Sequence, residues 1–433
     1  MSQTGDLNAT YKIAYAKGIE DLVPTISKLR DLIPFVPSEL QNGKHYQQPV
    51  VVTQEAGFTA SLDTQTAYTL NSAIGMEMQE AVVPGVDIVL SAVVGYNQAA
   101  RSLHSATSFK SVMGLKFENM LQSAEKRAEI LRLYGQSAIA AAAQQNVTIA
   151  SDMLPLVIDV AQWASGMWAG SENQNVVFVK SSDNTAVDAL RSFRIAKVDD
   201  EAHTLYLAAG TEGTPGTLTT LETAIEAYAC NLHFYGFVSG SAGSFAYAEM
   251  AGLKKQMTNT GSLFGIDAGA YDLWRGNSVS TSGQLTMAKV LSGVSRAVSR
   301  GLESDAAVFV NPKTWADLAS NLAALRRFDG SYSKKKSSNG SEELEYIGQN
   351  GVLKIIPYSI VKQGDCFIFP EDKVIRVGAY ELSLQDPTRR GSDEIFFTLP
   401  TAAGSGIRAY MNESIFIEAP AQCVYISGIV NSL

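Results

Sequence analysis

Apolar and polar residues alternate with a period of two from about Tyr46 to Ala99. The alternation is clearest in Val50–Gln54, Gly57–Leu62 and Val86–Val94, and this period is typical of strands with one covered face. Turn residues separate these pieces, so the pattern predicts a long two-stranded excursion. Because an isolated hairpin is only marginally stable in water, we expect this one to pack on another chain.

A helical period extends from about Thr107 to Tyr134. Apolar residues fall three or four positions apart and share one face: Phe117, Met120, Leu121, Ala124, Ala128, Leu131 and Tyr134. Charged residues take the other face: Glu118, Glu125, Lys126, Arg127, Glu129 and Arg132. Gly135 follows in the position favoured after a helix end. At roughly 1.5 Å per residue the helix would span about 40 Å, and we expect it to lie along a sheet.

The middle of the chain predicts more helix and one hairpin. Further helix is expected over residues 136–175, in an Ala-rich run at 138–143 and again from Leu154 to Trp168. Two short apolar stretches, Phe193–Val198 and Thr204–Leu207, flank a polar turn. That arrangement is typical of a β-hairpin.

The last third alternates helices and strands. An amphipathic helix at 284–302 precedes the strand Ala307–Val310, and a second helix begins with Asn311 as its cap and Pro312 in its first turn. The polar run 329–341 predicts an exposed loop. Strands then continue to the end: Leu353–Ile356, Cys366–Phe369, Val374–Val377, Ile395–Leu399, Ile407–Met411, Ile415–Ile417 and Val424–Val430.

Residues 1–44 have too few apolar positions to form a core. Pro24, Pro34 and Pro37 interrupt their short apolar pieces. We expect an arm that becomes ordered only by lying across another surface, which in an oligomer is often a neighbouring subunit.

Composition adds a preference for partners. The 433 residues can form two or three domains. Only 18% of them are charged, against about 25% in ordinary soluble domains, so some apolar surface is expected to meet partner subunits. The net charge of −9 argues against a dedicated nucleic-acid reader, although an acidic wall around DNA remains compatible with it.

The cysteines and histidines, which are common metal ligands in proteins, are scattered along the sequence. The cysteines Cys230, Cys366 and Cys423 form no CxxC pair, and we expect buried thiols rather than zinc ligands or disulfides. None of the histidines has metal-ligand spacing: His45, His104, His203 and His233. No metal or cofactor is therefore expected.

No targeting or membrane segment is predicted. The first residues lack the pattern of a secretory signal. The most apolar window, 81–94, is interrupted by Pro84, Gly85 and Asp87, whereas a spanning helix needs roughly 20 apolar residues. We expect a soluble protein that is made and kept in a cytoplasm.

Catalytic motifs are absent from the sequence. It contains no phosphate-binding glycine loop, HExxH or GxSxG. Gly293–Ala297 approaches a nucleophile elbow but lies within a predicted helix, and the acidic pairs Asp199-Asp200 and Glu342-Glu343 lie in turn-like contexts. The sequence favours a protein that is not an enzyme, although an enzyme with an unfamiliar site remains an alternative.

Five motifs follow one another in a characteristic order. They are Gly57-Phe-Thr-Ala-Ser61, Thr260-Gly-Ser-Leu-Phe-Gly-Ile-Asp-Ala-Gly-Ala-Tyr-Asp-Leu-Trp-Arg-Gly-Asn277, Asn311-Pro-Lys-Thr-Trp315, Asn350-Gly-Val-Leu-Lys-Ile-Ile-Pro-Tyr-Ser359 and Pro370-Glu-Asp-Lys-Val-Ile-Arg-Val-Gly378. With these motifs the chain resembles the tailed-bacteriophage major capsid protein family. The family has an α+β fold named after the Hong Kong 97 phage.

The resemblance implies a structural head protein that self-assembles into an icosahedral shell around a double-stranded DNA genome. It also implies a layout along the chain. The expected parts are an N-terminal arm (1–44), an extended E-loop (45–100), a peripheral domain (101–229) with a spine helix (107–134) and a variable hairpin (193–207), an axial domain (230–380), and C-terminal strands that return to the peripheral domain (381–433).

Particular residues acquire expected roles from this layout. Gly57, Gly75 and Gly85 are candidate hinges of the E-loop during shell expansion. The run Lys334, Lys335 and Lys336 is a candidate loop at the capsomer centre. It could meet phosphate, carboxylates of a neighbouring subunit or only water.

The resemblance also implies partners. They are copies of the chain in hexamers and pentamers, a portal, a possible decoration protein, and packaged DNA that is contacted weakly and without sequence preference. The E-loop has only Lys44 at its base, so we expect no covalent cross-link through a lysine. The short arm favours a separate scaffolding protein. The expected location is the virion capsid, assembled in the cytoplasm of a host bacterium.

Three alternatives remain open at this stage. An encapsulin-like cargo compartment would have the same fold but enclose a protein. A metabolic enzyme would form a small homogeneous oligomer. A tail or adhesion protein would form trimers or tubes.

Overall fold

The computed structural model describes residues 26–36, 45–62, 67–95, 112–241, 244–326, 344–386, 395–398 and 404–432. The chain separates into two compact units. Of the described residues, the first unit contains 89–95, 112–124, 382–386, 395–398 and 404–410, and the second contains 26–36, 45–62, 67–88, 125–241, 244–326, 344–381 and 411–432. Helix α3 (Val112–Tyr134) and strand β21 (Gly404–Ile417) run from one unit into the other.

In the first unit, the beginning of α3 packs with strands from two distant parts of the sequence. Strands β3 (Val86–Gly95) and β20 (Phe396–Thr398) both pair with β21. The helix and strands share one apolar cluster: Met120, Ile407, Ala409, Leu90, Ala92, Phe117, Leu382, Leu384 and Ile395. Phe117 and Met120 of the predicted apolar stripe therefore lie against strands, as expected. The predicted start of the helix at 107–111 lies outside the described residues.

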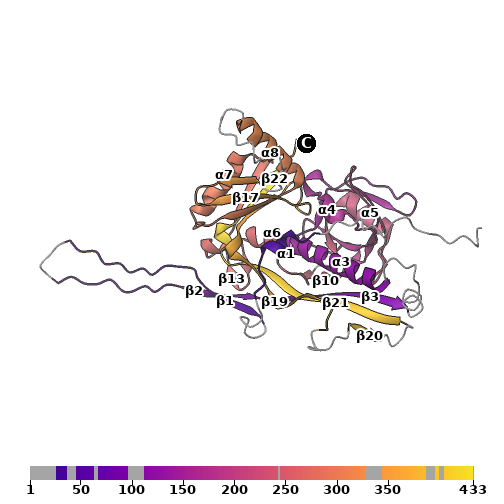
Figure 1. Ribbon diagram of the computed structural model, residues 1–433, viewed down its shortest axis with the longest axis horizontal. Coiled ribbons are helices and arrows are strands. Elements are labelled where there is room, and N and C mark those ends of the chain that lie inside the picture. Colours follow the sequence, from indigo (N-terminus) through magenta and orange to yellow (C-terminus); the bar gives the residue numbers. More distant parts are fainter. Residues whose placement is uncertain are drawn as a thin grey trace, which may run out of the picture. The chain divides into compact units, whose positions relative to one another are not determined.

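The second unit contains a six-stranded mixed sheet in the order β14-β22-β18-β15-β17-β16. Its strands are β14 (Asn277–Gly283), β15 (Ala306–Val310), β16 (Leu344–Ile347), β17 (Val352–Pro357), β18 (Cys366–Pro370) and β22 (Val424–Ile429). Helices α7 (Met287–Val298) and α8 (Pro312–Arg326) lie beside this sheet (Figure 1). Every residue of β15 is completely buried, which explains its unbroken apolar sequence.

The helix cap predicted at Asn311 is confirmed. The Asn311 side-chain oxygen accepts a hydrogen bond from the Lys313 N–H at 3.0 Å, and Pro312 is the first helical residue. The apolar face of α7 packs on the sheet through Val290 and Val294. The helical period predicted both helices because their apolar residues meet a single sheet face.

A second six-stranded sheet, also in the second unit, is entirely antiparallel in the order β4-β9-β6-β7-β8-β5. Its strands are β4 (Ala140–Ala142), β5 (Leu154–Val157), β6 (Asn175–Lys180), β7 (Phe193–Asp199), β8 (Thr204–Ala209) and β9 (Cys230–Phe234), accompanied by α5 (Leu218–Ala227). The hairpin predicted at 193–207 is β7–β8.

The helix predicted over 136–175 is wrong. The Ala-rich run forms β4 and Leu154–Val157 forms β5, and only α4 (Ser165–Trp168) is α-helical there. Alanine favours helices only weakly as a prior, and pairing with β9 overrides that preference. Pro155 is tolerated because β5 is an edge strand.

Two predicted boundaries do not coincide with structural edges. The boundary between Ala229 and Cys230 lies within the antiparallel sheet, because β9 pairs with both β4 and β6. The last predicted strand, β22, pairs with β14 and β18 of the mixed sheet. The sheets therefore join residues from both sides of each predicted boundary, and the division into peripheral and axial parts stays a prediction.

The remaining elements are short or belong to the hairpin. The second unit also contains α1 (Lys28–Leu32), β1 (Tyr46–Val51), β2 (Met78–Val83), β10 (Val238–Ser241), β11 (Ser244–Tyr247), α6 (Leu253–Met257), β12 (Ser262–Leu263), β13 (Ile266–Asp267) and most of β19 (Val374–Ser383). Short 3-10 turns are η2 (Val160–Gln162), η3 (Val187–Leu190), η4 (Asp272–Trp274), η5 (Glu371–Lys373) and η6 (Pro420–Gln422). None of the described helices is long and apolar enough to cross a membrane.

The charged face of α3 is buried at its C-terminal end rather than solvated. Arg132 is 1% exposed, and it donates to Glu125 at 2.7 Å, to Glu129 at 2.6 Å and to Glu413 at 2.6 and 3.1 Å. Burial alone would lower the pKa of Arg132, but Glu413, Glu129 and Glu125 raise it above its ordinary value. This ionic network ties α3 to β21.

A second buried arginine extends the network to β19. Arg376 donates to Glu413 at 3.2 Å and to Glu381 at 2.8 Å. Glu413 therefore joins two arginines from elements that are distant in sequence. Since buried charges are costly unless they are paired, each of these groups holds the others in place.

The described part of the N-terminal arm, residues 26–36, is anchored on the same chain. The Glu129 carboxylate accepts the backbone N–H groups of Leu29 at 3.1 Å and Arg30 at 2.8 Å. Leu29 and Ile33 are buried. Residues 26–36 thus lie across a surface of their own chain, and contact of the arm with a neighbouring subunit stays a prediction. The rest of the predicted arm lies outside the described residues.

The three cysteines are buried free thiols. Burial raises the pKa of Cys230 to about 11, and it raises the pKa values of Cys366 and Cys423 further. The predicted role as small buried side chains is confirmed. Thiols of this kind react slowly with alkylating reagents while the chain is folded.

Replacing Glu413 by alanine should strongly destabilise the second unit. The change leaves Arg132 and Arg376 buried without their shared carboxylate, and breaking a buried pair in this way costs about 3–5 kcal/mol. Glu381→Ala is the matched control, because Glu381 also pairs with Arg376 but is 43% exposed; it should cost about 0–1 kcal/mol. Urea unfolding of the unassembled chain measures both, and equal small losses would contradict the role given to Glu413.

Candidate functional site: the hairpin of residues 45–88

The hairpin has a buried root. Strands β1 and β2 pair antiparallel, from Tyr46 opposite Val83 to Val51 opposite Met78. Ala81 and Val83 are completely buried. Their side chains belong to a cluster with Ile266, Ala268, Trp274, Val377, Phe416 and the partly buried Tyr46, Val50 and Phe264.

Aromatic rings fix this root in place. Phe416 of β21 lies 5.9 Å from the ring of Tyr46, 5.7 Å from Phe264 and 6.2 Å from Trp274, measured between centroids. Such pairs add about 0.5–1.5 kcal/mol each beyond the area that they bury. Burial, and then the nearby Glu418, raise the pKa of Tyr46. The motif segment 260–277 thus contributes the surface on which the hairpin rests.

A polar contact supports the second strand of the root. The Tyr271 hydroxyl donates to Glu77 at 2.5 Å and accepts a hydrogen bond from Gln79 at 3.1 Å. The hydrogen bond to Glu77 raises the pKa of Tyr271. Together with the aromatic cluster, this contact sets the direction in which the hairpin leaves the sheet.

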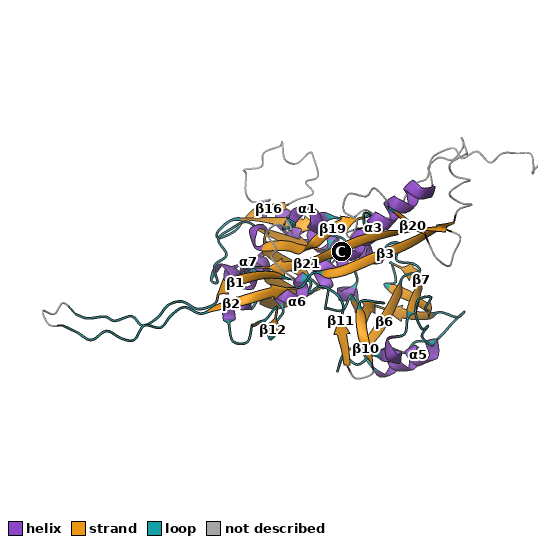
Figure 2. Ribbon diagram, turned by 90° about the horizontal axis from the view of Figure 1, so that it is seen from below, coloured by secondary structure: helices purple, strands orange, loops and turns teal. Residues whose placement is uncertain are grey.

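Beyond the root, the two legs of the hairpin (described residues 52–62 and 67–77) are joined by few hydrogen bonds. Ala56 and Ile74 form an isolated bridge, with N–H to oxygen distances of 2.9 and 3.3 Å. Asn71 adds hydrogen bonds to Thr59 and Phe58. Figure 2 shows the legs as loop running beyond β1 and β2. Two strands alone are marginal in water, so the legs need a further surface.

The legs expose large apolar side chains. Phe58 is 88% exposed, Leu62 89% and Leu70 72%. Tyr68, Ile74, Met76 and Met78 are half exposed or more. Contiguous exposed apolar side chains of this kind mark a surface that binds a partner. The hairpin is therefore the candidate functional site.

The three candidate hinge glycines occupy different surroundings. Gly57 has a φ of +93°, and a Cβ there would lie 2.4 Å from the Ser72 carbonyl oxygen. Gly85, between β2 and β3, would place a Cβ 2.2 Å from the side-chain oxygen of Asn412. Gly75 has open space around it. Local geometry thus requires glycine at positions 57 and 85. A hinge role for all three glycines stays a prediction.

The remaining sequence predictions concern residues outside the hairpin. Lys334, Lys335 and Lys336 lie outside the described residues. Among the residues that the structure describes, no group of three or more His, Cys, Asp or Glu side chains could hold a metal ion. Sequence reasoning missed Phe416 as the centre of the root, since nothing in the sequence links it to Tyr46 or Trp274.

The arrangement of elements has known counterparts. The chain matches the capsid subunit of cyanophage A-1(L) over 98% of both chains, with a TM-score of 0.54 and 9% sequence identity. The chain has the fold of a tailed-phage capsid subunit. The predicted Hong Kong 97 phage-type α+β fold is thereby confirmed.

Two other solved structures are similar at lower scores. The capsid of a native GTA particle matches 99% of this chain and 98% of its own, with a TM-score of 0.49 and 8% identity. The SrpI encapsulin from Synechococcus elongatus PCC 7942 matches 100% of this chain and 97% of its own, with a TM-score of 0.41 and 9% identity. No family model and no curated protein sequence matches this chain.

Gly57→Val should loosen the hairpin, whereas Gly75→Val should not. A β-branched residue at a left-handed φ costs about 1–3 kcal/mol, and its Cβ would push against the Ser72 carbonyl. We expect faster amide hydrogen exchange at Ala56 and Ile74 in Gly57→Val only, measured on the unassembled chain. Wild-type exchange rates in both variants would contradict this account of Gly57.

Proposed function

We propose that this chain is the major capsid protein of a tailed double-stranded DNA phage and that its function is assembly. Copies bind one another through the hairpin and close into an icosahedral shell around the genome. In this role the chain is a structural protein and not an enzyme. The observation that carries the proposal is the exposed apolar hairpin on a capsid-subunit fold.

The free energy available from burying the hairpin is too small for one strong contact between two copies, but it is enough for many contacts in a closed assembly. Burying a Phe, Leu or Ile side chain contributes about 1.5–3 kcal/mol, so covering Phe58, Leu62, Leu70 and Ile74 would contribute about 6–12 kcal/mol. Association itself costs about 4–15 kcal/mol. One hairpin contact is therefore weak. In a closed ring every copy gives and receives a hairpin, and the contacts reinforce one another.

The proposed layout follows the predicted parts. Residues 1–44 would be the arm, 45–100 the E-loop and 107–134 the spine helix. Within 230–380, α7, α8 and five strands of the mixed sheet would form the main body of the axial part, and β22 would join this sheet from the C-terminal segment. Gly57, Gly75 and Gly85 would let the E-loop turn as the shell expands, and Lys334–Lys336 would lie near the capsomer centre.

The proposed partners extend beyond copies of the chain. A separate scaffolding protein and a portal would guide assembly in the cytoplasm of a host bacterium. Packaged DNA would touch the shell weakly and without sequence preference, because the chain carries a net charge of −9. A decoration protein could bind the outside of the shell.

Replacing Phe58, Leu62 and Leu70 together by serine should abolish shell formation while leaving the subunit folded. The three side chains contact little of their own chain, so their loss removes only burial gained between copies. Electron microscopy and light scattering of protein expressed with its scaffold measure the outcome. The matched control replaces Val160, Ile347 and Val430 by serine, since these residues are also exposed; it should still assemble.

Other outcomes would favour other functions. A wild-type chain that remains a small homogeneous oligomer under all assembly conditions would contradict the capsid proposal and favour an enzyme. Tubes or trimers would favour a tail or adhesion protein. Closed shells that contain a protein cargo in place of DNA would favour an encapsulin-like compartment.

A further inference from the structure

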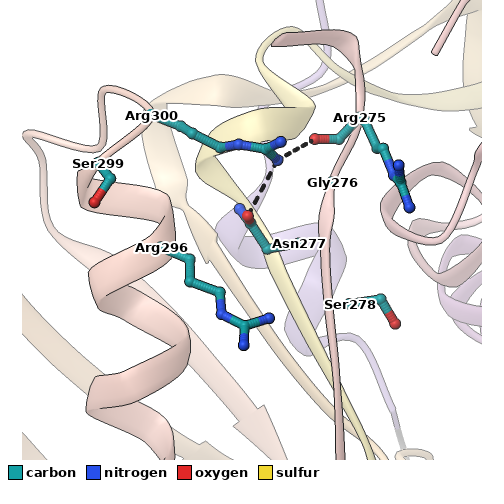
Figure 3. A pocket seen from close by; sticks show the side chains of 7 residues that line it. All are labelled: Arg275, Gly276, Asn277, Ser278, Arg296, Ser299 and Arg300. Atoms are coloured by element: carbon teal, nitrogen blue, oxygen red, sulfur yellow. Dashed lines mark hydrogen bonds between the residues drawn. The ribbon is translucent and has the colours of Figure 1, made fainter. Parts of the chain in front are cut away.

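A basic pocket lies in the second unit, away from the hairpin legs. It has a volume of about 400 Å³ and is lined by Arg275, Gly276, Asn277, Ser278, Arg296, Ser299 and Arg300. Figure 3 shows the arginines arriving from two elements: the segment leading into β14 and the end of α7. The lining contains three guanidinium groups and no carboxylate.

One of the three arginines is already paired. Arg300 donates to the Arg275 carbonyl oxygen at 3.0 Å and to the Asn277 side-chain oxygen at 3.1 Å (Figure 3). It also forms an ion pair with Asp272. Arg300 therefore holds the pocket wall in shape, and its charge is balanced.

The other two arginines are not balanced. Arg275 and Arg296 are exposed, and within the described ranges neither guanidinium has a hydrogen-bond or ion-pair partner. The C-terminal end of α7 attracts a cation such as Arg296, but this does not explain Arg275, which lies on a different element. Two free guanidinium groups on one pocket favour an anionic ligand, for which arginine's planar fork is well suited.

The hairpin has the complementary charge. Residues 45–88 contain five acidic residues, Glu55, Asp63, Glu77, Glu80 and Asp87, and no lysine or arginine. Glu77 pairs with Tyr271, and Asp87 accepts a hydrogen bond from Asn412. Glu55 is exposed on the first leg and has no side-chain partner in the described part of the chain. A surface that receives this hairpin must therefore tolerate or attract negative charge.

A carboxylate of the hairpin cannot easily reach the arginine pocket of the same chain. Its root is fixed by burial of Ala81 and Val83. Figures 1 and 2 both show the legs leading away from α7, which carries Arg296. A carboxylate from the hairpin therefore reaches such a pocket more readily on another copy.

We propose that the pocket formed by Arg275 and Arg296 binds an acidic side chain of the hairpin, Glu55, from a second copy of this chain. This inference rests on the proposed shell function and names a specific contact within it. The apolar side chains of the legs supply most of the burial, and the carboxylate–arginine contact fixes the register in which the hairpin lies.

Charge reversal tests the contact. Arg275→Glu with Arg296→Glu should lower the yield of closed shells at least tenfold, and Glu55→Arg alone should also lower it. Combining all three changes should restore the yield to within threefold of wild type. The control Lys197→Glu with Lys313→Glu changes two exposed lysines outside the pocket and should assemble normally. Wild-type assembly shows that the shell function holds, independently of these variants.

Two results would overturn the proposal. One is wild-type assembly by Arg275→Glu with Arg296→Glu. The other is a defect in that variant with no rescue by Glu55→Arg, which would indicate that the pocket binds another anion such as a nucleic-acid phosphate. Assembly in phosphate-free buffer without nucleic acid separates these sources.

A cysteine pair covers the case in which the reversed charges prevent folding. Because the native cysteines are buried, Glu55→Cys with Arg296→Cys should give disulfide-linked dimers and longer chains in oxidised shells. Each single variant should give at most a trace of dimer. Absence of linked chains in the double variant would contradict the contact.

Discussion

The position of the whole hairpin depends on the burial of its root against Phe416. Ala81 and Val83 are packed there together with Tyr46, Phe264 and Trp274, and this packing fixes where β1 and β2 leave the body. Beyond Val51 and Met78, almost none of the described leg side chains are buried against their own chain. The base of the hairpin is held firmly, whereas Phe58, Leu62 and Leu70 are exposed to water. Exposed apolar side chains of this kind are typical of a surface that binds a partner.

A rigid body is needed for this placement to be useful. The ionic network around Arg132 and Arg376 joins α3, β19, β21 and the segment before the hairpin through Glu129 and Glu413. Phe416 lies three residues after Glu413 on the same strand. The strand that organises the buried charges therefore also organises the hairpin root.

The sequence predicted those elements that are determined by residues close to one another along the chain. The alternation at 46–99 indicated a two-stranded excursion, and β1 and β2 form its root. Two of the predicted strand pieces were wrong for this hairpin, because Gly57–Leu62 is not a strand and Val86–Val94 belongs to β3, which pairs with β21. Asn311 with Pro312 correctly marked the start of α8. Local information failed at the Ala-rich run, where pairing with β9, about 90 residues later, decides the structure.

The same limit applies to the candidate site and its surroundings. The sequence showed a charged face on α3 but not its burial, because Arg132 and Arg376 meet their shared partner Glu413 only in the folded chain. The pocket of Arg275 and Arg296 likewise exists only because α7 lies beside β14. The resemblance to capsid proteins predicted the fold class correctly. The layout of arm, E-loop, peripheral and axial parts that it implies stays a prediction.

If the exposed hairpin legs become buried on sister copies, their chemical reactivity must fall on assembly. The most direct measurement is the rate at which a thiol reagent labels Leu70→Cys, since the native cysteines are buried and react slowly. We expect rapid labelling of the unassembled subunit and at least tenfold slower labelling of the same residue in intact shells, with full labelling after denaturation. Equally rapid labelling in both states would contradict it.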